Sequence, residues 1–406
     1  MSDQEYFCAA AWTALYLDTD GTVDFCCIAR NNLGNIRESS VQQILQSDRV
    51  RQIRQKMLAN EPVPGCESCW RQTKEHRLQK FFNTKYVEQQ PIGSARIPDP
   101  VLDENFYTDD QASRIKYLDL RWNNTCNFAC IYCGEKYSSF WAEQAQRSPL
   151  PVKLTEKPDR SHKREVFDFL DQAIETVDWI YFAGGEPLAI KENVEILDTL
   201  YAHNPECVLQ INTNLSLLVN NPVFERLQKF TNVRWMISGE GMGTLFEYVR
   251  WPGKWNTFEQ NLATISALRG RGHEITFNLV AMNINHLSIW DYLDYLLGLD
   301  LVSKPTDINI NIYNSRDSSQ PFAIQRMPRS WRDQARERVI QSGYAVDGIN
   351  NYLAALDDPV PENDSGWSGL EFTVARLRAL DRSRDLDSRA IFPHVYEYVE
   401  NQPKIL

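Results

Sequence analysis

Residues 115–312 alternate between short runs rich in β-branched and aromatic residues and longer runs with apolar residues at helical spacing. The β-rich runs are IKYLDLRW, VDWIYFAG, CVLQINT, VRWMISG, EITFNLVAM and TDININIY. Segments between them, such as KREVFDFLDQAIETV, place apolar residues every three or four positions, as on one helix face. This alternation predicts an α/β fold with parallel strands, in a barrel or an open doubly wound sheet.

The remaining segments predict the domain organisation. Residues 87–112 are polar, contain proline and lack periodicity, so we expect a linker there between a domain at 1–86 and a core at 113–315. Residues 316–406 should form a mainly helical C-terminal extension, because RSWRDQARERVIQ, INNYLAALDD and LEFTVARLRALDR have helical patterns.

Composition and charge limit the possible functions. Hydrophobic residues make up 43% of the 406 residues and the net charge is −11, which indicates a globular protein and argues against nucleic-acid binding by bulk electrostatics. No apolar run is long enough to span a membrane, and the first residues, MSDQEYFCAAAW, do not resemble a signal peptide. We therefore expect a cytoplasmic protein whose nine cysteines are metal ligands or free thiols rather than disulfides.

Four chemically distinctive segments directly follow predicted strands. NNTCNFACIYCGEKY follows the first strand of the core, AGGEP the second, NTNLS the third and SGEG the fourth. Ligands of parallel α/β folds bind at the carboxyl ends of the strands. The order of the segments alone therefore predicts that these four turns meet at one site.

The first of these segments has the spacing C-x3-C-x2-C, formed by Cys126, Cys130 and Cys133. Thiolates are soft ligands that suit zinc and iron–sulfur clusters. Three protein ligands leave one position open, for a water on zinc or for a cofactor on one iron of a four-iron cluster. A fourth ligand from elsewhere in the chain would instead make an inert zinc site.

The C-x3-C-x2-C loop after the first strand, together with GGEP after the second, resembles the radical S-adenosylmethionine (SAM) superfamily over residues 115–312. The resemblance implies a partial (β/α)6 barrel of the TIM type that holds a 4Fe–4S cluster on Cys126, Cys130 and Cys133. It also implies that SAM binds the open iron and is cleaved reductively to methionine and a 5′-deoxyadenosyl radical, which abstracts hydrogen from a substrate. In such enzymes the protein positions the cofactor and excludes competing reactions.

The same resemblance implies roles for further residues. Tyr132 should lie near the adenine of SAM, and Arg250 should bind its carboxylate, which suits a guanidinium fork. The SAM amino group should contact Gly184, Gly185 and Glu186. The ribose contacts should be Asn212, Asn214 and Ser238. Each has a structural alternative as a packing, turn or surface residue, and SGEG departs from the common S-x-D form, which leaves Glu240 without a role.

A second group of cysteines lies in the first seventy residues. CAAAWTALYLDTDGTVDFCC predicts a β-hairpin around Asp-Gly, a helical stretch opens at RESS, and PVPGCESCW adds a C-x2-C pair. Cys8, Cys66 and Cys69, with either Cys26 or Cys27, supply four thiolates, enough for an iron–sulfur cluster or a zinc site. Adjacent cysteines point in different directions along an extended backbone, so we expect one of the pair to bind.

The order of these motifs resembles half of a SPASM domain, the twitch module that carries an auxiliary iron–sulfur cluster. The module usually follows the barrel, whereas here it precedes it as a small α+β domain. Counting from Gly21, the pattern favours Cys26. The resemblance implies an auxiliary cluster, expected to be of the 4Fe–4S type, that accepts an electron from a substrate radical. A zinc ribbon over residues 1–70 is the alternative.

Understood SPASM and twitch enzymes act mostly on peptides and proteins, so the resemblance implies a peptide or protein substrate, in the maturation of a ribosomally synthesised peptide (RiPP). The cysteine module occupies the N-terminal region and no appended peptide-recognition domain is evident, so we expect a separate peptide-recognition protein as a partner. We also expect an electron donor such as flavodoxin or ferredoxin. Two alternatives remain: a radical SAM enzyme acting on a nucleotide, tRNA or small molecule, and a zinc-binding scaffold protein without enzymatic activity.

Overall fold

The computed structural model describes residues 5–72, 77–85, 114–147, 163–302, 304–313, 320–359 and 369–402. The expected linker at 87–112 lies outside these residues. The chain divides into two compact units, which are described separately. The first comprises Met1–Thr125, Glu156–Asn212 and Val219–Arg234, and the second comprises Cys126–Thr155, Thr213–Leu218 and Trp235–Leu406.

The strands of the described residues confirm the expected α/β fold. They are β1 (Ala14–Leu17), β2 (Thr22–Asp24), β3 (Gly34–Asn35), β4 (Tyr117–Leu120), β5 (Trp179–Phe182), β6 (Val208–Thr213), β7 (Val233–Ser238), β8 (Glu274–Ala281) and β9 (Ile308–Ile312). Their hydrogen-bonded order is β3-β2-β1-β4-β5-β6-β7-β8-β9. The six predicted strands of the core are β4 to β9, and they follow one another in chain order, as in a partial barrel.

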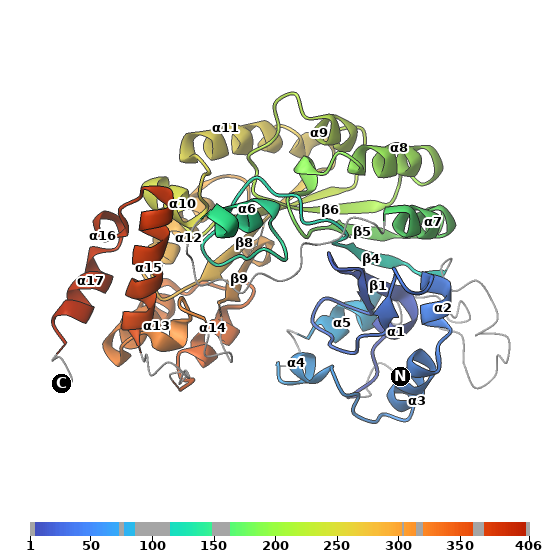
Figure 1. Cartoon of the computed structure of the whole chain (residues 1–406), viewed down its shortest axis with the longest axis horizontal. Helices are drawn as coiled ribbons and strands as arrows, with labels where there is room; N and C mark the ends of the chain where they lie inside the picture. Colours follow the sequence, from blue (N-terminus) through green and yellow to red (C-terminus); the bar gives the residue numbers. More distant parts are fainter. Residues whose placement is uncertain are drawn as a thin grey trace. The chain divides into compact units, whose positions relative to one another are not determined.

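In the first unit, the N-terminal hairpin joins the first strand of the core. β1 pairs antiparallel with β2 and parallel with β4, with Leu15 opposite Leu118 (Figure 1). The turn between β1 and β2 ends at Gly21, whose φ of +83° favours glycine. β5 continues the parallel pairing from β4 to β6.

The helices of the first unit are α1 (Ala10–Thr13), α2 (Val41–Leu45), α3 (Asp48–Leu58), α4 (Glu67–Trp70), α5 (Leu78–Asn83), α7 (Lys163–Ala173), α8 (Asn193–His203) and α9 (Pro222–Leu227). The helical stretch predicted from RESS onward is two helices, because Ser47 interrupts it and caps α3 by accepting a hydrogen bond from the Val50 amide. The predicted amphipathic helix is α7, which buries Val166, Phe169 and Leu170.

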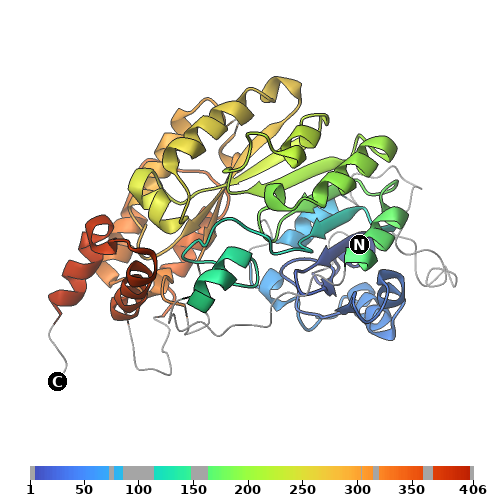
Figure 2. The same ribbon diagram turned by 45° about the horizontal axis from the view of Figure 1, so that its top comes forward.

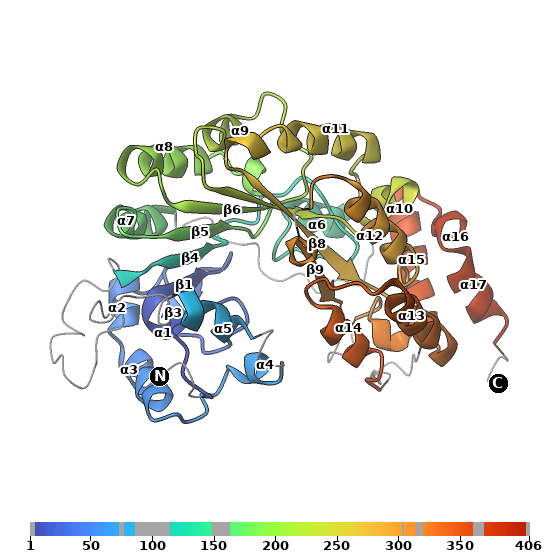
Figure 3. The ribbon, with the colours of Figure 1, turned by 180° about the vertical axis from the view of Figure 1, so that it is seen from behind.

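The helices of the second unit are α6 (Ser139–Arg147), α10 (Gly243–Val249), α11 (Trp255–Ser266), α12 (Ser288–Gly298), α13 (Arg329–Ser342), α14 (Ile349–Ala355), α15 (Leu370–Arg384), α16 (Ser388–Ile391) and α17 (Pro393–Glu400). β8 and β9 lie side by side and α14 packs beside β9 (Figure 3). The expected helical C-terminal region is present, and its helices α15 and α17 pack together (Figure 2). None of the helices that the structure describes is both long and apolar enough to cross a bilayer.

One hydrophobic core of the second unit joins the cysteine segment to the C-terminal helices. Ala129 and Ile131, which lie between the cysteines, are buried in the same cluster as Leu377 and Leu380 of α15 and Val395 of α17. Burial of such apolar side chains is the main favourable term in folding. The C-terminal helices therefore support the segment that the sequence singles out.

Candidate functional site

Cys126, Cys130 and Cys133 lie on one short loop of the second unit, which we call the cysteine loop (Cys126–Cys133). Cys130 is buried, and Cys126 and Cys133 are half-buried. All three are free thiols. Burial raises the pKa of Cys130 to about 12, so the thiol is neutral until a metal displaces its proton.

Hydrogen bonds to its backbone fix the shape of the cysteine loop. The amides of Ala129 and Ile131 donate to the carbonyls of Trp251 and Val249, at 2.8 and 2.9 Å. The indole Nε1 of Trp141 donates to the carbonyl of Cys130 at 2.6 Å, and the Oγ of Ser138 donates to the carbonyl of Phe128 at the same distance. Side chains of α6 and its preceding residue thus hold carbonyls of the loop, while amides of the loop pair with the end of α10 and the residues that follow it.

Arg384, the last residue of α15, also holds this loop. Its Nη2 donates to the carbonyl of Ala129 at 2.8 Å. Its guanidinium carbon lies 4.9 Å from the ring centres of both Trp141 and Trp251, a cation–π arrangement on two sides. Burial lowers the pKa of Arg384 to about 10. No sequence motif marks this residue, which lies 255 positions from Ala129 in the chain.

Arg250 forms a buried network beside the cysteine loop. Its Nε and Nη2 donate to the two carboxylate oxygens of Glu240 at 2.7 and 2.8 Å, and its Nη2 also donates to the hydroxyl of Tyr132. The Tyr132 hydroxyl donates to Glu240 at 3.0 Å. The remaining nitrogen, Nη1, lies 4.0 Å from the Sγ of Cys130. The structure thus brings two predicted SAM-binding residues, Tyr132 and Arg250, to one of the predicted cluster ligands.

Glu240 is a residue that the sequence left without a role. It is fully buried, and although burial disfavours a charged Arg250, the adjacent Glu240 carboxylate raises the pKa of Arg250 well above its usual value. The Nδ2 of Asn285 donates to the Glu240 carbonyl at 3.2 Å, which fixes the backbone here. Glu240 therefore orients the guanidinium of Arg250.

Asn214 connects the turn after β6 to the cysteine loop through Asn127. The Nδ2 of Asn214 donates to the Oδ1 of Asn127 at 3.0 Å, and the Nδ2 of Asn127 donates to Ser216 at 2.8 Å. The Ser216 hydroxyl donates back to Asn214 at 2.6 Å, which closes a triangle. Asn127 was not predicted, because an asparagine between two cysteines gives no signal of its own. Ser238 is the last residue of β7, at the strand end that the sequence predicted.

In the first unit, the GGEP segment packs against the residues that follow β4. The amides of Gly185 and Glu186 donate to the carbonyls of Asn123 and Thr125, at 3.1 and 2.8 Å. A Cβ on Gly185 would lie 2.2 Å from the Thr125 carbonyl oxygen, and one on Gly184, where φ is +96°, would lie 2.9 Å from that of Asn123. Both positions therefore require glycine because the GGEP segment and residues 123–125 approach each other closely.

Glu186 and Asn212 also lie at strand ends of the first unit. The carboxylate of Glu186 is buried and accepts a hydrogen bond from the amide of Leu188 at 3.1 Å, which caps a short 3₁₀ helix, η5 (Pro187–Ala189). Asn212 is half-buried near the end of β6. These positions agree with the predicted placement at the carboxyl ends of the strands, and contact with SAM stays a prediction.

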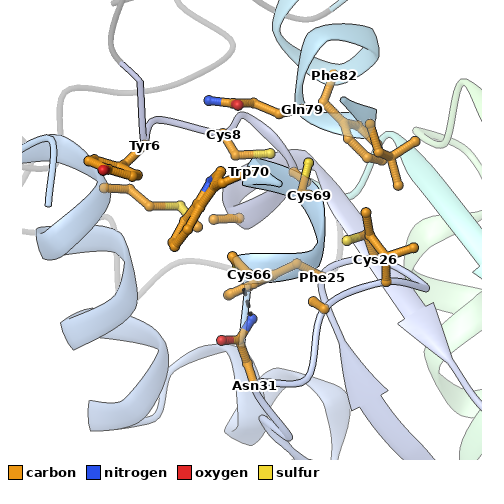
Figure 4. A pocket seen from close by; sticks show the side chains of 16 residues that line it. Tyr6, Cys8, Phe25, Cys26, Asn31, Cys66, Cys69, Trp70, Gln79 and Phe82 are labelled. Atoms are coloured by element: carbon orange, nitrogen blue, oxygen red, sulfur yellow. Dashed lines mark hydrogen bonds between the residues drawn. The ribbon is translucent and has the colours of Figure 1, made fainter. Parts of the chain in front are cut away.

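The second cysteine group lines one cavity of the first unit (Figure 4). Cys8 precedes α1, Cys26 follows β2, Cys66 precedes α4 and Cys69 lies in α4. We call this the four-cysteine cavity. Phe25, Trp70 and Phe82 complete much of an apolar wall. All four thiols are free, so the structure brings together the ligand set that the sequence predicted.

The backbone separates Cys26 from Cys27. Cys26 lines the four-cysteine cavity, whereas Cys27 is not among the lining residues. Burial and the nearby carboxylate of Asp119 on β4 raise the pKa of Cys27 to about 11, while Arg121 lowers it. The two thiols thus face different surroundings, and the structure favours Cys26 as the ligand. The backbone here is a turn, in which the Ala29 amide donates to the Cys26 carbonyl at 3.2 Å, and not the extended chain on which the prediction was based.

Both cysteine sets have the chemistry of iron–sulfur ligands, because thiolates suit iron–sulfur clusters as well as zinc. The four-cysteine cavity supplies four thiols, enough to complete the coordination of a four-iron cluster. Among the described residues, no group of three or more His, Cys, Asp or Glu side chains was found in the arrangement of a single-ion site.

Burial has a chemical consequence for cluster binding in the four-cysteine cavity. It raises the pKa of Cys66 to about 11, and the pKa values of Cys8, Cys26 and Cys69 are raised for the same reason. The metal-free cavity therefore holds neutral thiols at neutral pH. Because metals bind thiolates, loading a cluster here releases protons.

Two family models match the segments that contain these sites. Residues 121–296 match the radical SAM superfamily, and residues 8–70 match an iron-sulfur cluster-binding domain (SPASM). A curated GTP 3′,8-cyclase from Campylobacter lari (strain RM2100 / D67 / ATCC BAA-1060) is 27% identical over 190 residues, which are 46% of this chain and 53% of that protein. The chain thus spans about half the length of this relative.

Solved structures of low similarity were also found. The crystal structure of Streptococcus suis SuiB bound to SAM is 12% identical, covers 57% of this chain and 49% of SuiB, and has a TM-score of 0.36. Native anSMEcpe with bound AdoMet is 17% identical, covers 57% of this chain and 63% of that protein, and also has a TM-score of 0.36.

The two family matches confirm the expectations from the cysteine motifs. The matched segments contain the cysteine loop and all four thiols of the four-cysteine cavity. They confirm a SAM-binding 4Fe–4S cluster, SAM itself and an auxiliary iron–sulfur cluster as cofactors, whereas the roles of individual residues stay predictions. The chain therefore contains a radical SAM domain over residues 121–296 and, N-terminal to it, an iron–sulfur cluster-binding domain of the SPASM/twitch kind over residues 8–70.

Proposed function

We propose that this enzyme reductively cleaves SAM and removes a hydrogen atom from a peptide or protein, in the maturation of a ribosomally synthesised peptide. The observation that carries the radical step is the cysteine loop with Arg250 beside Cys130. When bound, the cluster and SAM supply a 5′-deoxyadenosyl radical. The residues described below hold and orient these groups.

Arg250 is the residue that we assign to the SAM carboxylate. Glu240 takes the Nε and Nη2 donors of its guanidinium, and Nη1 is the nitrogen that faces Cys130. A fork that is already oriented by a buried carboxylate loses little freedom when it binds a ligand. We assign Tyr132 to the adenine, Gly184, Gly185 and Glu186 to the amino group, and Asn212, Asn214 and Ser238 to the ribose.

The four-cysteine cavity is the place that we assign to the auxiliary cluster, with Cys8, Cys26, Cys66 and Cys69 as ligands. Four thiolates complete the coordination of a four-iron cluster and leave no iron for a substrate. Its proposed role is therefore to accept one electron from the substrate radical, which suits an oxidised product with a new bond.

The N-terminal module supports a peptide over a nucleotide. Residues 8–70 match the SPASM domain, and SPASM and twitch enzymes of known function act mostly on peptides and proteins. The preference for a peptide rests on this resemblance.

A nucleotide substrate is the second candidate. It is favoured by the match to the GTP 3′,8-cyclase, which covers 46% of this chain. Both candidates share the radical step. They differ in the negative charge of the substrate, which the substrate site must neutralise for a nucleotide.

The proposal includes partners. A separate peptide-recognition protein would deliver the peptide, and flavodoxin or ferredoxin would supply the electron that starts SAM cleavage. These roles, and a cytoplasmic location, follow from the resemblance of the motifs and from the composition of the chain.

The test is SAM cleavage by anaerobically reconstituted enzyme with dithionite. Release of 5′-deoxyadenosine should rise above background with small peptides encoded beside this chain's gene, and should not rise with GTP. The control is the variant with Cys126, Cys130 and Cys133 all replaced by alanine, which should release none. Stimulation by GTP and by no peptide would overturn the peptide proposal, and iron-loaded protein without any cleavage would overturn the radical step.

A further inference from the structure

Asn31 places an amide donor on a sulfur of the four-cysteine cavity. Its side chain is 1% exposed and lines the cavity, and its Nδ2 lies 3.7 Å from the Sγ of Cys66, within hydrogen-bond distance for sulfur (Figure 4). The second hydrogen of Nδ2 is directed to the Oδ1 of Asp24, at 3.2 Å. Both donors of the amide are thus engaged.

The buried carboxylate of Asp24 fixes the orientation of this amide. Asp24 is 3% exposed and accepts backbone hydrogen bonds from Phe25 and Asn31 at 2.8 Å and from Asn32 at 3.0 Å. Rotating the amide by half a turn would put its oxygen, an acceptor, against the Asp24 carboxylate, which is also an acceptor. The nitrogen must therefore face the sulfur.

The orientation of the Asn31 amide is energetically unfavourable for its oxygen atom. Among the described residues, its Oδ1 is buried and has no hydrogen-bond partner. A buried polar atom without a partner is destabilising. Since an apolar side chain of the same shape would avoid this cost, packing alone does not account for an asparagine at this position.

We propose that Asn31 is a positioning residue that raises the reduction potential of the auxiliary cluster through an N–H···S hydrogen bond to Cys66. A donor on a cluster thiolate withdraws negative charge and favours the reduced state, and hydrogen bonds to sulfur are among the groups that set cluster potentials. A higher potential makes the cluster a better one-electron acceptor. The inference rests on a cluster in the four-cysteine cavity and is independent of the substrate.

Gln79 supplies a matched control, because it is the other carboxamide among the lining residues of this cavity. Its Nε2 donates to the backbone carbonyls of Glu5, at 3.0 Å, and Phe7, and to no cysteine sulfur. Replacing Gln79 by leucine removes a buried amide from the same wall without removing a donor to sulfur. It therefore separates a disturbed cavity from a lost N–H···S bond.

The experiment uses the full chain with Cys126, Cys130 and Cys133 replaced by alanine, so that the auxiliary cluster is the one that remains. Redox titration followed by electron paramagnetic resonance should give a lower midpoint potential for Asn31→Leu, which removes the donor without adding a charge. Gln79→Leu should keep the parent potential. Equal potentials in the parent and Asn31→Leu, or an equal shift in Gln79→Leu, would overturn the inference.

A second measurement needs no variant to load a cluster. Pulsed electron paramagnetic resonance of the reduced parent, grown with side-chain nitrogen-labelled asparagine, should show coupling of the labelled nitrogen to the cluster. Absence of this coupling would overturn the inference. Iron and sulfide analysis of the parent distinguishes the causes of failure: a parent without a cluster overturns the assignment of the cavity, whereas a loaded parent without coupling overturns the role of Asn31 and leaves the proposed function intact.

Discussion

Arg250 and Glu240 form a two-point ion pair that is almost completely removed from solvent. The hydrogen bonds measure 2.7 and 2.8 Å, and the side chains of Arg250 and Glu240 are 5% and 0% exposed. Removing one member of such a pair leaves an uncompensated buried charge, which costs far more than the loss of a surface pair.

Glu240→Ala should therefore lower the free energy of unfolding by about 3–5 kcal/mol. Urea unfolding followed by tryptophan fluorescence measures this loss. Asp168→Ala is the control, since Asp168 pairs with Arg164 at 3.6 Å on the exposed surface of α7, and its loss should cost under about 0.5 kcal/mol. Similar losses for the two variants would contradict the role given to Glu240.

Arg384→Ala should destabilise the protein by about 2–4 kcal/mol, because it removes the hydrogen bond to Ala129 and the packing between Trp141 and Trp251. The cysteine loop should also retain less iron after anaerobic purification. Arg378→Ala on the same helix, where the side chain is 55% exposed, should change stability by under about 0.5 kcal/mol. If iron content and unfolding midpoint match the parent in Arg384→Ala, α15 does not hold the loop.

Gly185→Ala should destabilise the first unit by about 1–3 kcal/mol or more, since its Cβ would overlap the Thr125 carbonyl at 2.2 Å. Gly270→Ala, where a Cβ meets no atom within 4 Å, is the matched control and should be near neutral. Thermal unfolding of the metal-free chains compares the two. A Gly185→Ala midpoint equal to that of Gly270→Ala would refute the close packing of GGEP on residues 123–125.

Cys26→Ala should lose the iron and sulfide of the auxiliary cluster, whereas Cys27→Ala should retain them, because Cys26 alone of the two lines the four-cysteine cavity. Iron analysis should give about half the parent content for Cys26→Ala, since each cluster holds about four irons. Cys207→Ala is a control at a buried thiol outside both sites. The opposite pattern, with iron lost on replacing Cys27, would reverse the assignment.

His286 should make the second unit sensitive to acid. Burial and the nearby His394 lower the pKa of His286 to about 4 from 6.5, while a hydrogen bond with the Asn283 carbonyl opposes the shift. Between these values the unfolded chain binds the proton more readily than the folded one, so stability falls as the pH drops from about 6.5 towards 4.

At pH values below the pKa of His286 in the folded protein, this site lowers the free energy of unfolding by an amount on the order of 3 kcal/mol. Urea unfolding across that pH range measures it in the parent and in His286→Phe, which keeps a ring to stack on Trp331, 4.6 Å away. The variant should show a shallower decline with acid. An identical slope in both proteins would assign the acid sensitivity to other groups.

Local patterns of the chain were enough to predict the strands and the two cysteine sets. The β-rich runs became β4 to β9 because alternating and β-branched residues suit half-buried strands, and C-x3-C-x2-C places three thiols together within one loop. The grouping of Cys8, Cys26, Cys66 and Cys69 in one cavity was predicted from the order of the motifs. The hairpin and the helical stretch between these cysteines could also be predicted from the sequence.

Contacts between residues distant in the chain could not be predicted in this way. Neither Arg384 nor Trp251 carries a pattern that points to Ala129, because their contact depends on how α15 packs in the core. Glu240 was passed over because its segment departs from a familiar form, although its charge had to be balanced once buried. The amide of Asn31 on Cys66 likewise depends on the fold rather than on local sequence.

The pairing of β1 with β4 affects how this protein could be divided. β1 covers the backbone donors and acceptors along one side of β4, with Tyr16 opposite Asp119 and Leu17 opposite Leu120. In a fragment lacking the first seventy residues, the backbone N–H and C=O groups on that side of β4 would be exposed and could pair with strands of other molecules. We expect such a fragment to self-associate, which light scattering of the fragment and of the full chain would compare.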